Sequence, residues 1–277
     1  MAKATRQGRT AKVGRPTTAA AVQFPTERTA PRNKLGEYSI LVYGREKIGK
    51  TSLASCFPDA LFISFEPGTR ALSVYEMQPD NWKAFRSIVL ALKTETRFKT
   101  IVIDTVDLAY RQCEEYVCKR EGIDHPSDED WGKGWAAVKN EFAGTLNKLL
   151  SQSRGVVFVS HETERSIKRR GGRETTRIVP TMAGQARTVI EPMIDIWAYY
   201  HYTGDDGTQR VIRVVGDDLI SAGHRTRGHF KNIASVPAGE NEQEAYANFV
   251  SAFNNEPVEG ATTINTNNTT ARRRKSK

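Results

Sequence analysis

The sequence predicts an α/β fold in which a mostly parallel central sheet carries helices on both faces. Short apolar runs at residues 38–43, 61–65, 100–103 and 156–159 are typical of buried strands. Helical patterns of about ten residues or more lie between most of them, and glycine or proline follows several. Strands that alternate with helices favour parallel pairing, and ligands of such sheets bind beyond the carboxyl ends of the strands.

The length and composition set the limits of the prediction. The chain has 277 residues with 38% hydrophobic content, enough for one large domain or two small ones. No apolar run approaches 18 residues, and no apolar segment follows the basic N-terminus, so we expect neither a membrane span nor secretion. A cytoplasmic protein is expected, in the host cytoplasm if it is viral. The three cysteines form no C-x-x-C pair, although a metal site from Cys113, Cys118 and His125 stays open as an alternative.

The net charge of +9 belongs to the two ends of the chain. Residues 1–36 carry +7 and residues 254–277 carry +3, which leaves −1 on residues 37–253. Both ends lack apolar periodicity, so we expect disordered basic arms at 1–36 and 254–277. They either solubilise the protein or hold the phosphates of a nucleic acid through counterion release.

Between these two basic ends of the chain we expect a core over residues 37–235 and a helical segment over 236–253. A helix follows Thr51, and a strand over 61–65 ends at Glu66. The next predicted elements are a helix around Trp82, a strand over 100–104, a helix over about 106–120 and a polar acidic loop over 122–132. A long amphipathic helix then precedes the strand at 156–160.

The second half of the chain changes character after this strand. Residues 162–177 are basic, contain Gly171 and Gly172 and lack apolar periodicity, which predicts a mobile loop. Residues 193–202 and 209–215 alternate around a glycine-rich turn and predict a β-hairpin. A segment over 223–230 follows a turn, and a last helix is expected over 240–253.

One stretch carries the strongest functional signal. Residues 44–51 read Gly-Arg-Glu-Lys-Ile-Gly-Lys-Thr between an apolar strand and a helix start, the G-x-x-x-x-G-K-[ST] pattern of a phosphate-binding loop. Backbone N–H groups wrap a triphosphate there, Lys50 reaches its outer phosphates and Thr51 places a hydroxyl on Mg²⁺. The expected ATP-binding residues are Gly44, Arg45, Glu46, Lys47, Ile48, Gly49, Lys50, Thr51 and Ser52.

Polar residues end the other strands and should converge on this loop. Asp104 lies where a second Mg²⁺-coordinating carboxylate belongs, or it caps the next helix. Thr105 supplies no base beside Asp104, so Glu66 can orient the attacking water, or it is a loop carboxylate in solvent. His161 can sense the γ-phosphate, or it is a locally satisfied histidine.

Other classes of phosphate-loop protein fit less well. A GTPase needs an Asn-Lys-x-Asp segment, and Asn147-Lys148 lacks the aspartate. A small-molecule kinase needs an arginine-bearing lid, for which residues 165–177 are the sole candidate.

The order of these features resembles the RecA-like core ATPases, and more narrowly the short phage-encoded annealing or recombination ATPases, over about residues 37–235. The resemblance implies a P-loop core with a C-terminal β-hairpin extension, and it places Glu66 at the position of the water-activating glutamate. His161 stands where that group usually has a glutamine that couples nucleotide state to DNA. The implied DNA-binding loop contributes Arg165, Lys168, Arg169, Arg170, Arg173 and Arg177. Arg225 and Arg227 resemble cations that reach a neighbouring subunit's γ-phosphate.

The sequence therefore predicts a Mg²⁺- and ATP-dependent DNA-binding ATPase that acts in recombination or single-strand annealing. Its expected partner is single-stranded DNA. A ring or filament of identical subunits is expected, with a single-strand-binding protein as a further candidate partner. A nucleotide-switched accessory module with little hydrolysis and a metabolite kinase remain as alternatives.

Overall fold

The computed structural model describes residues 24–168, 172, 174–204 and 206–264. The chain divides into two units, residues 1–31 and residues 32–277, and the helices and strands given below all belong to the second.

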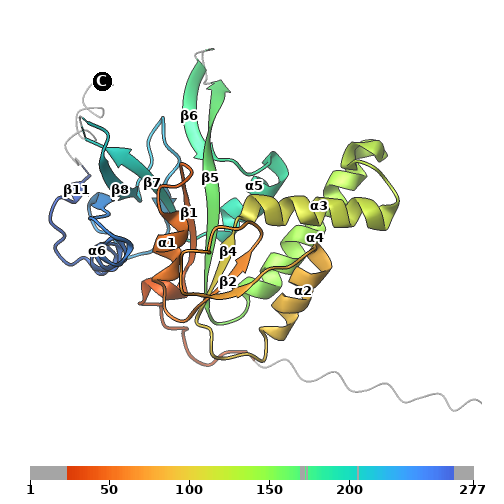
Figure 1. Cartoon of the computed structure of the whole chain (residues 1–277), viewed down its shortest axis with the longest axis horizontal. Helices are drawn as coiled ribbons and strands as arrows, with labels where there is room; N and C mark the ends of the chain where they lie inside the picture. Colours follow the sequence, from red (N-terminus) through yellow and green to blue (C-terminus); the bar gives the residue numbers. More distant parts are fainter. Residues whose placement is uncertain (1–23, 169–171, 173, 205, 265–277) are drawn as a thin grey trace, which may run out of the picture. The chain divides into compact units, whose positions relative to one another are not determined.

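A single mixed sheet forms the centre of this second unit (Figure 1). Its strands lie in the order β11-β10-β8-β7-β1-β5-β4-β2-β3, with β6 paired to β5 and β9 paired to β7. The strands are β1 (Ser39–Gly44), β2 (Ala60–Ser64), β3 (Tyr75–Met77), β4 (Thr100–Asp104), β5 (Gly155–Lys168), β6 (Glu174–Pro180), β7 (Ile196–Thr203), β8 (Gln209–Arg213), β9 (Gly223–His224), β10 (Ile233–Pro237) and β11 (Thr262–Thr263).

The six strands from β7 to β3 pair in parallel, whereas β8, β10 and β11 add antiparallel strands at one edge. Gly44 at the end of β1 pairs with His161, and Ser64 at the end of β2 pairs with Asp104. The predicted mostly parallel sheet is therefore confirmed, and its register brings the polar strand ends to one edge.

Helices cover both faces of the sheet (Figure 1). The helices are α1 (Lys50–Ser55), α2 (Trp82–Ala91), α3 (Val106–Glu121), α4 (Lys133–Leu150), α5 (Gly184–Ile190) and α6 (Glu242–Asn254). Helices α2 to α5 pack on the face that carries Leu41, Ile103 and Phe158, and helices α1 and α6 pack on the face that carries Val42 and Val102. Strands β1, β2 and β4 are buried throughout, as expected where both faces are covered.

The mobile loop predicted over residues 162–177 is wrong. Strand β5 continues as a strand from the sheet to Lys168, and β6 returns antiparallel to it (Figure 1). Arg165 thereby lies opposite Arg177. We call residues 162–180 the arm. Sequence reasoning missed it because its side chains alternate between polar types, which gives no apolar period to detect.

Some smaller elements also differ from the prediction. Strand β3 and helix α5 were not predicted. The predicted acidic loop contains two short 3₁₀ helices, η2 (Pro126–Asp128) and η3 (Asp130–Gly132). Two further 3₁₀ helices are η1 (Leu35–Glu37) and η4 (Glu191–Met193). Leu35 is buried and β11 pairs with β10, so the folded core extends beyond both predicted boundaries.

Candidate nucleotide-binding site

The loop between β1 and α1 has the backbone that its sequence predicts. Gly49 has φ +108°, which a residue with a side chain rarely adopts, and Lys47 also has a positive φ of +60°. Helix α1 begins directly afterwards at Lys50, so its N-terminus adds free N–H groups and a partial positive charge to the loop. The arrangement suits an anion.

Lys50 is held over this loop. Its side chain is buried, and Nζ donates hydrogen bonds to the carbonyl oxygens of Gly44 at 2.9 Å and Arg45 at 2.6 Å. Burial lowers the pKa of Lys50, while the carboxylates of Asp104 and Glu66 oppose that shift. The ammonium group is thus positioned to exchange a backbone oxygen for a phosphate oxygen.

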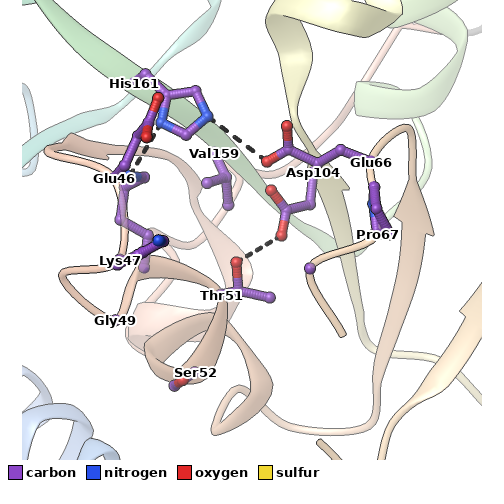
Figure 2. A pocket seen from close by; sticks show the side chains of 12 residues that line it. Glu46, Lys47, Gly49, Thr51, Ser52, Glu66, Pro67, Asp104, Val159 and His161 are labelled. Atoms are coloured by element: carbon purple, nitrogen blue, oxygen red, sulfur yellow. Dashed lines mark hydrogen bonds and ion pairs between the residues drawn. The ribbon is translucent and has the colours of Figure 1, made fainter. Parts of the chain in front are cut away.

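Thr51 and Asp104 meet beside the lysine. The Thr51 hydroxyl donates to Asp104 Oδ2 at 2.7 Å (Figure 2). Asp104 is 1% exposed, and its Oδ1 has no hydrogen-bond partner among the described residues. Burial raises the pKa of Asp104 to about 6, although the Thr51 hydroxyl lowers it.

These two side chains fit a magnesium ion. Mg²⁺ prefers hard oxygen donors and keeps water and phosphate oxygens in its shell, so one hydroxyl and one carboxylate suffice from the protein. A side chain at Gly68 would lie 3.6 Å from Thr51 Oγ1 and 3.8 Å from Asp104 Oδ2, so glycine keeps this space open. Bound there, the ion would supply charge to the outer phosphates.

Glu66 and His161 form the other side of the site. His161 Nε2 lies 3.6 Å from Glu66 Oε1 (Figure 2). Its Nδ1 lies 3.4 Å from Lys50 Nζ. The contact with Glu66 raises the pKa of His161 above its ordinary value, against the effect of burial. The structure therefore brings the predicted lysine, threonine, aspartate, glutamate and histidine together.

A cavity of about 460 Å³ lies among these groups. It is lined by Glu46, Lys47, Gly49, Lys50, Thr51, Ser52, Glu66, Pro67, Gly68, Asp104, Val159 and His161 (Figure 2). Three of the predicted nucleotide-binding residues do not line the cavity: Gly44, Arg45 and Ile48. Ile48 is buried in the hydrophobic core instead.

Sequence reasoning missed Asp107. Its Oδ1 accepts hydrogen bonds from Thr181 Oγ1 at 2.8 Å and Ser160 Oγ at 3.2 Å, which fastens the base of the arm to the first turn of α3. An aspartate in the first turn of a helix is ordinary there, so nothing in the sequence distinguished it.

The predicted DNA-binding cations fall on the arm where they can be placed. Arg165 and Arg177 lie opposite one another, and Lys168 is exposed near its end, 3.8 Å from Glu174. The other three, Arg169, Arg170 and Arg173, lie outside the described residues.

Arg225 and Arg227 lie away from the nucleotide cavity of their own chain. Strand β9, just before them, pairs with the start of β7, whereas the loop follows the other end of the neighbouring β1. The Arg225 guanidinium pairs with Asp195 at 2.7 Å and donates to the carbonyl oxygen of Pro192. Arg227 is exposed.

No helix among the residues that the structure describes is long and apolar enough to cross a membrane. Over the same residues, no group of three or more His, Cys, Asp or Glu side chains is arranged to hold a metal ion, and this includes Cys113, Cys118 and His125.

The fold and the site together define a P-loop nucleotide-binding domain of the ATPase type. A phosphate-binding loop, a lysine and a magnesium-type carboxylate meet at the carboxyl edge of a parallel sheet.

The chain belongs to a family described as an AAA domain, whose model matches residues 36–226. It is also similar to the SPbeta prophage-derived uncharacterized protein YorG of Bacillus subtilis (strain 168), with 28% identity over 184 residues. The match covers 63% of this chain and 54% of the relative, so the chain spans about half the length of the curated relative it matches.

Proposed function

We propose that this protein is a Mg²⁺-dependent ATPase that binds DNA and acts in recombination or single-strand annealing. The observation that carries the proposal is that β5 runs unbroken from His161 at the nucleotide site into the basic arm. One continuous strand would therefore join the phosphate end of the nucleotide to the cations that would hold DNA.

In this proposal each side chain of the cavity has its own task. Lys50 binds the outer phosphates, and Thr51 and Asp104 hold the magnesium ion. Glu66 orients the attacking water once the nucleotide draws His161 away from it. His161 then passes the state of the γ-phosphate to the arm, because it lies within the same strand.

The arm carries cations that can contact the phosphates of DNA. Arg165 and Arg177 lie opposite one another on its two strands, and Lys168, three residues beyond Arg165, lies on the other face beside Glu174. Phosphate contacts of this kind fix position without sequence preference. Single-stranded DNA is the partner we propose. The similarity to a prophage-derived protein supports a phage origin.

We further propose that the protein assembles from identical subunits and that Arg225 or Arg227 serves a neighbour's site. The position of Arg225, far along the sheet from its own loop, supports a role in trans. An Arg225→Ala subunit mixed with a Lys50→Ala subunit should then recover ATP turnover. Absence of recovery at every mixing ratio would count against this role.

The proposal is tested by ATP hydrolysis measured with and without single-stranded DNA, at low and high salt. We expect DNA to stimulate turnover at low salt and lose its effect as salt screens the phosphate contacts. Tight ATP binding with almost no turnover would instead indicate a nucleotide switch. The 3.6 Å contact that occupies Glu66 favours this second candidate. Turnover that ignores DNA and responds to a small acceptor would indicate a kinase.

A further inference from the structure

A second cavity, of about 310 Å³, lies at the base of the arm. It is bounded by β6, α5, the start of β7 and β9, and residues of all four line it. Arg177, Arg187 and Arg225 contribute cationic side chains, and Trp197 contributes an apolar wall.

Arg187 lies within the field of two other arginines, Arg177 in the cavity lining and Arg165 beyond it. Arg165 and Arg177 are directly opposite on β5 and β6, where like charges destabilise a strand pair. Arg187 joins them from α5, with a side chain that is 18% exposed. Burial lowers the pKa of Arg187, and the positive charges of Arg165 and Arg177 lower it further. An anion between these groups would relieve the repulsion.

The protein itself supplies little compensating charge. Glu191 and Asp195 line the cavity, and Asp195 is already paired with Arg225 at 2.7 Å. Glu191 lies 4.0 Å from Arg187, which leaves the cations in excess.

Hydrogen-bonding capacity is also left over. Arg177 Nε is buried without a hydrogen-bond partner among the described residues, and Arg177 Nη2 makes a long contact of 3.4 Å with the carbonyl oxygen of Ile220. A buried donor of this kind is costly unless a ligand accepts from it.

We propose that this cavity binds a phosphodiester group of the DNA strand that the arm holds, with Arg177 and Arg187 as its ligands. The planar guanidinium groups suit the oxygens of a phosphate, to which they can donate in pairs. The inference rests on the proposed function, because it assumes the same bound strand. It adds Arg187, a residue of α5, to a surface otherwise formed by the arm.

Binding of a labelled single-stranded oligonucleotide, followed by fluorescence anisotropy across a salt series, tests the inference. Arg187→Gln should weaken binding about tenfold at low salt and reduce the slope of log affinity against log salt by about 0.7. Arg187→Lys keeps the charge but loses the paired donors, so it should restore the salt slope and recover only part of the affinity. Arg111→Gln, at an exposed position on α3, should bind as the wild type does. Thermal unfolding of each variant checks that it is folded.

The outcomes separate this inference from the proposed function. If Arg187→Gln binds DNA normally while Lys168→Gln binds it weakly, the arm holds DNA and the cavity does not. If the wild type binds no DNA at any salt, both proposals fail. Titration with inorganic phosphate tests whether the cavity binds free phosphate and not the phosphate of a DNA strand. Phosphate binding that Arg187→Gln abolishes, together with unchanged DNA binding, would identify a free-phosphate site and overturn the inference.

Discussion

At the scale of single residues, the nucleotide site consists of side chains that already hold one another without a ligand. Lys50 donates to backbone carbonyl oxygens, and Thr51 donates to Asp104. Glu66 contacts the ring of His161. Each partner offers a contact that a phosphate, a magnesium ion or a water could replace. Binding and turnover should therefore depend on different members of the set.

Changing Glu66 to Gln should separate ATP binding from ATP turnover. We expect the variant to bind ATP normally and to lose turnover by about a hundredfold or more, since it keeps the shape of the side chain but removes the base. Titration with a fluorescent ATP analogue and a phosphate-release assay measure the two properties. Glu115→Gln is the matched control, because Glu115 is exposed on α3 and does not line the cavity. Normal turnover of Glu66→Gln would require another base.

Gly44 has a packing role that the motif conceals. A Cβ at this position would lie 2.0 Å from the carbonyl oxygen of Tyr200 on β7. Gly44→Ala should therefore force β1 and β7 apart and lower the free energy of unfolding by about 1–3 kcal/mol, measured by urea denaturation. Gly144→Ala is the control, because a Cβ there meets open space within α4. It should raise stability by about 0.5–1 kcal/mol. Equal stability of Gly44→Ala and the wild type would contradict the packing role.

At the scale of elements, the elements that local sequence patterns mark were predicted. The elements that depend on pairing with a distant strand were not. The strands that end at Gly44, Asp104 and His161 were predicted because apolar runs and a loop motif mark them. The arm could not be recognised, since Glu162, Glu164 and Lys168 look like a loop until β6 pairs with them. Arg187 could not be assigned either, because pairing in the folded chain brings it toward Arg165 and Arg177.

Asp195 links strands β1, β7 and β9, and its ionisation should make the free energy of unfolding depend on pH. It accepts hydrogen bonds from Ser39 at the start of β1 and from Arg225 just after β9, and it directly precedes β7. Burial acts to raise the pKa of Asp195, but the hydrogen bonds from Arg225 and Ser39 outweigh it, so the pKa lies below the ordinary 3.8. This carboxylate therefore stabilises the fold above pH 3.8, and its contribution is lost as the pH falls through the lower folded pKa.

Asp195→Asn should accordingly lower the free energy of unfolding by about 1–3 kcal/mol at neutral pH. The gap from the wild type should narrow as the pH falls below 3.8. Urea denaturation at several pH values measures it. Asp59→Asn removes an exposed pair with Lys99 and should cost less than about 1 kcal/mol. A gap that stays constant through the acid range would show that the charge of Asp195 is not the cause.

At the scale of the whole molecule, positive charge is concentrated at the two ends of the sequence. Residues 1–23 and 265–277 contain five Lys or Arg each and no acidic residue, which leaves −1 on residues 24–264. The cations of the arm and the second cavity therefore act within a nearly neutral core. The two ends and the arm should contribute differently to DNA binding, because the arm continues β5, the strand that passes through the nucleotide site.

Neutralising the ends should separate these contributions. In the full-length chain with those ten Lys and Arg residues changed to Gln, we expect weaker DNA binding and a shallower salt dependence, because fewer counterions are released. The ratio of DNA affinities with and without ATP should survive, since His161 and the arm are unchanged. Anisotropy of a labelled oligonucleotide measures both quantities. Lys50→Ala in the full chain is the control, because it keeps the charged ends and should lose the response to ATP. If the response instead disappears with the charges of the ends, they and not the arm sense the nucleotide.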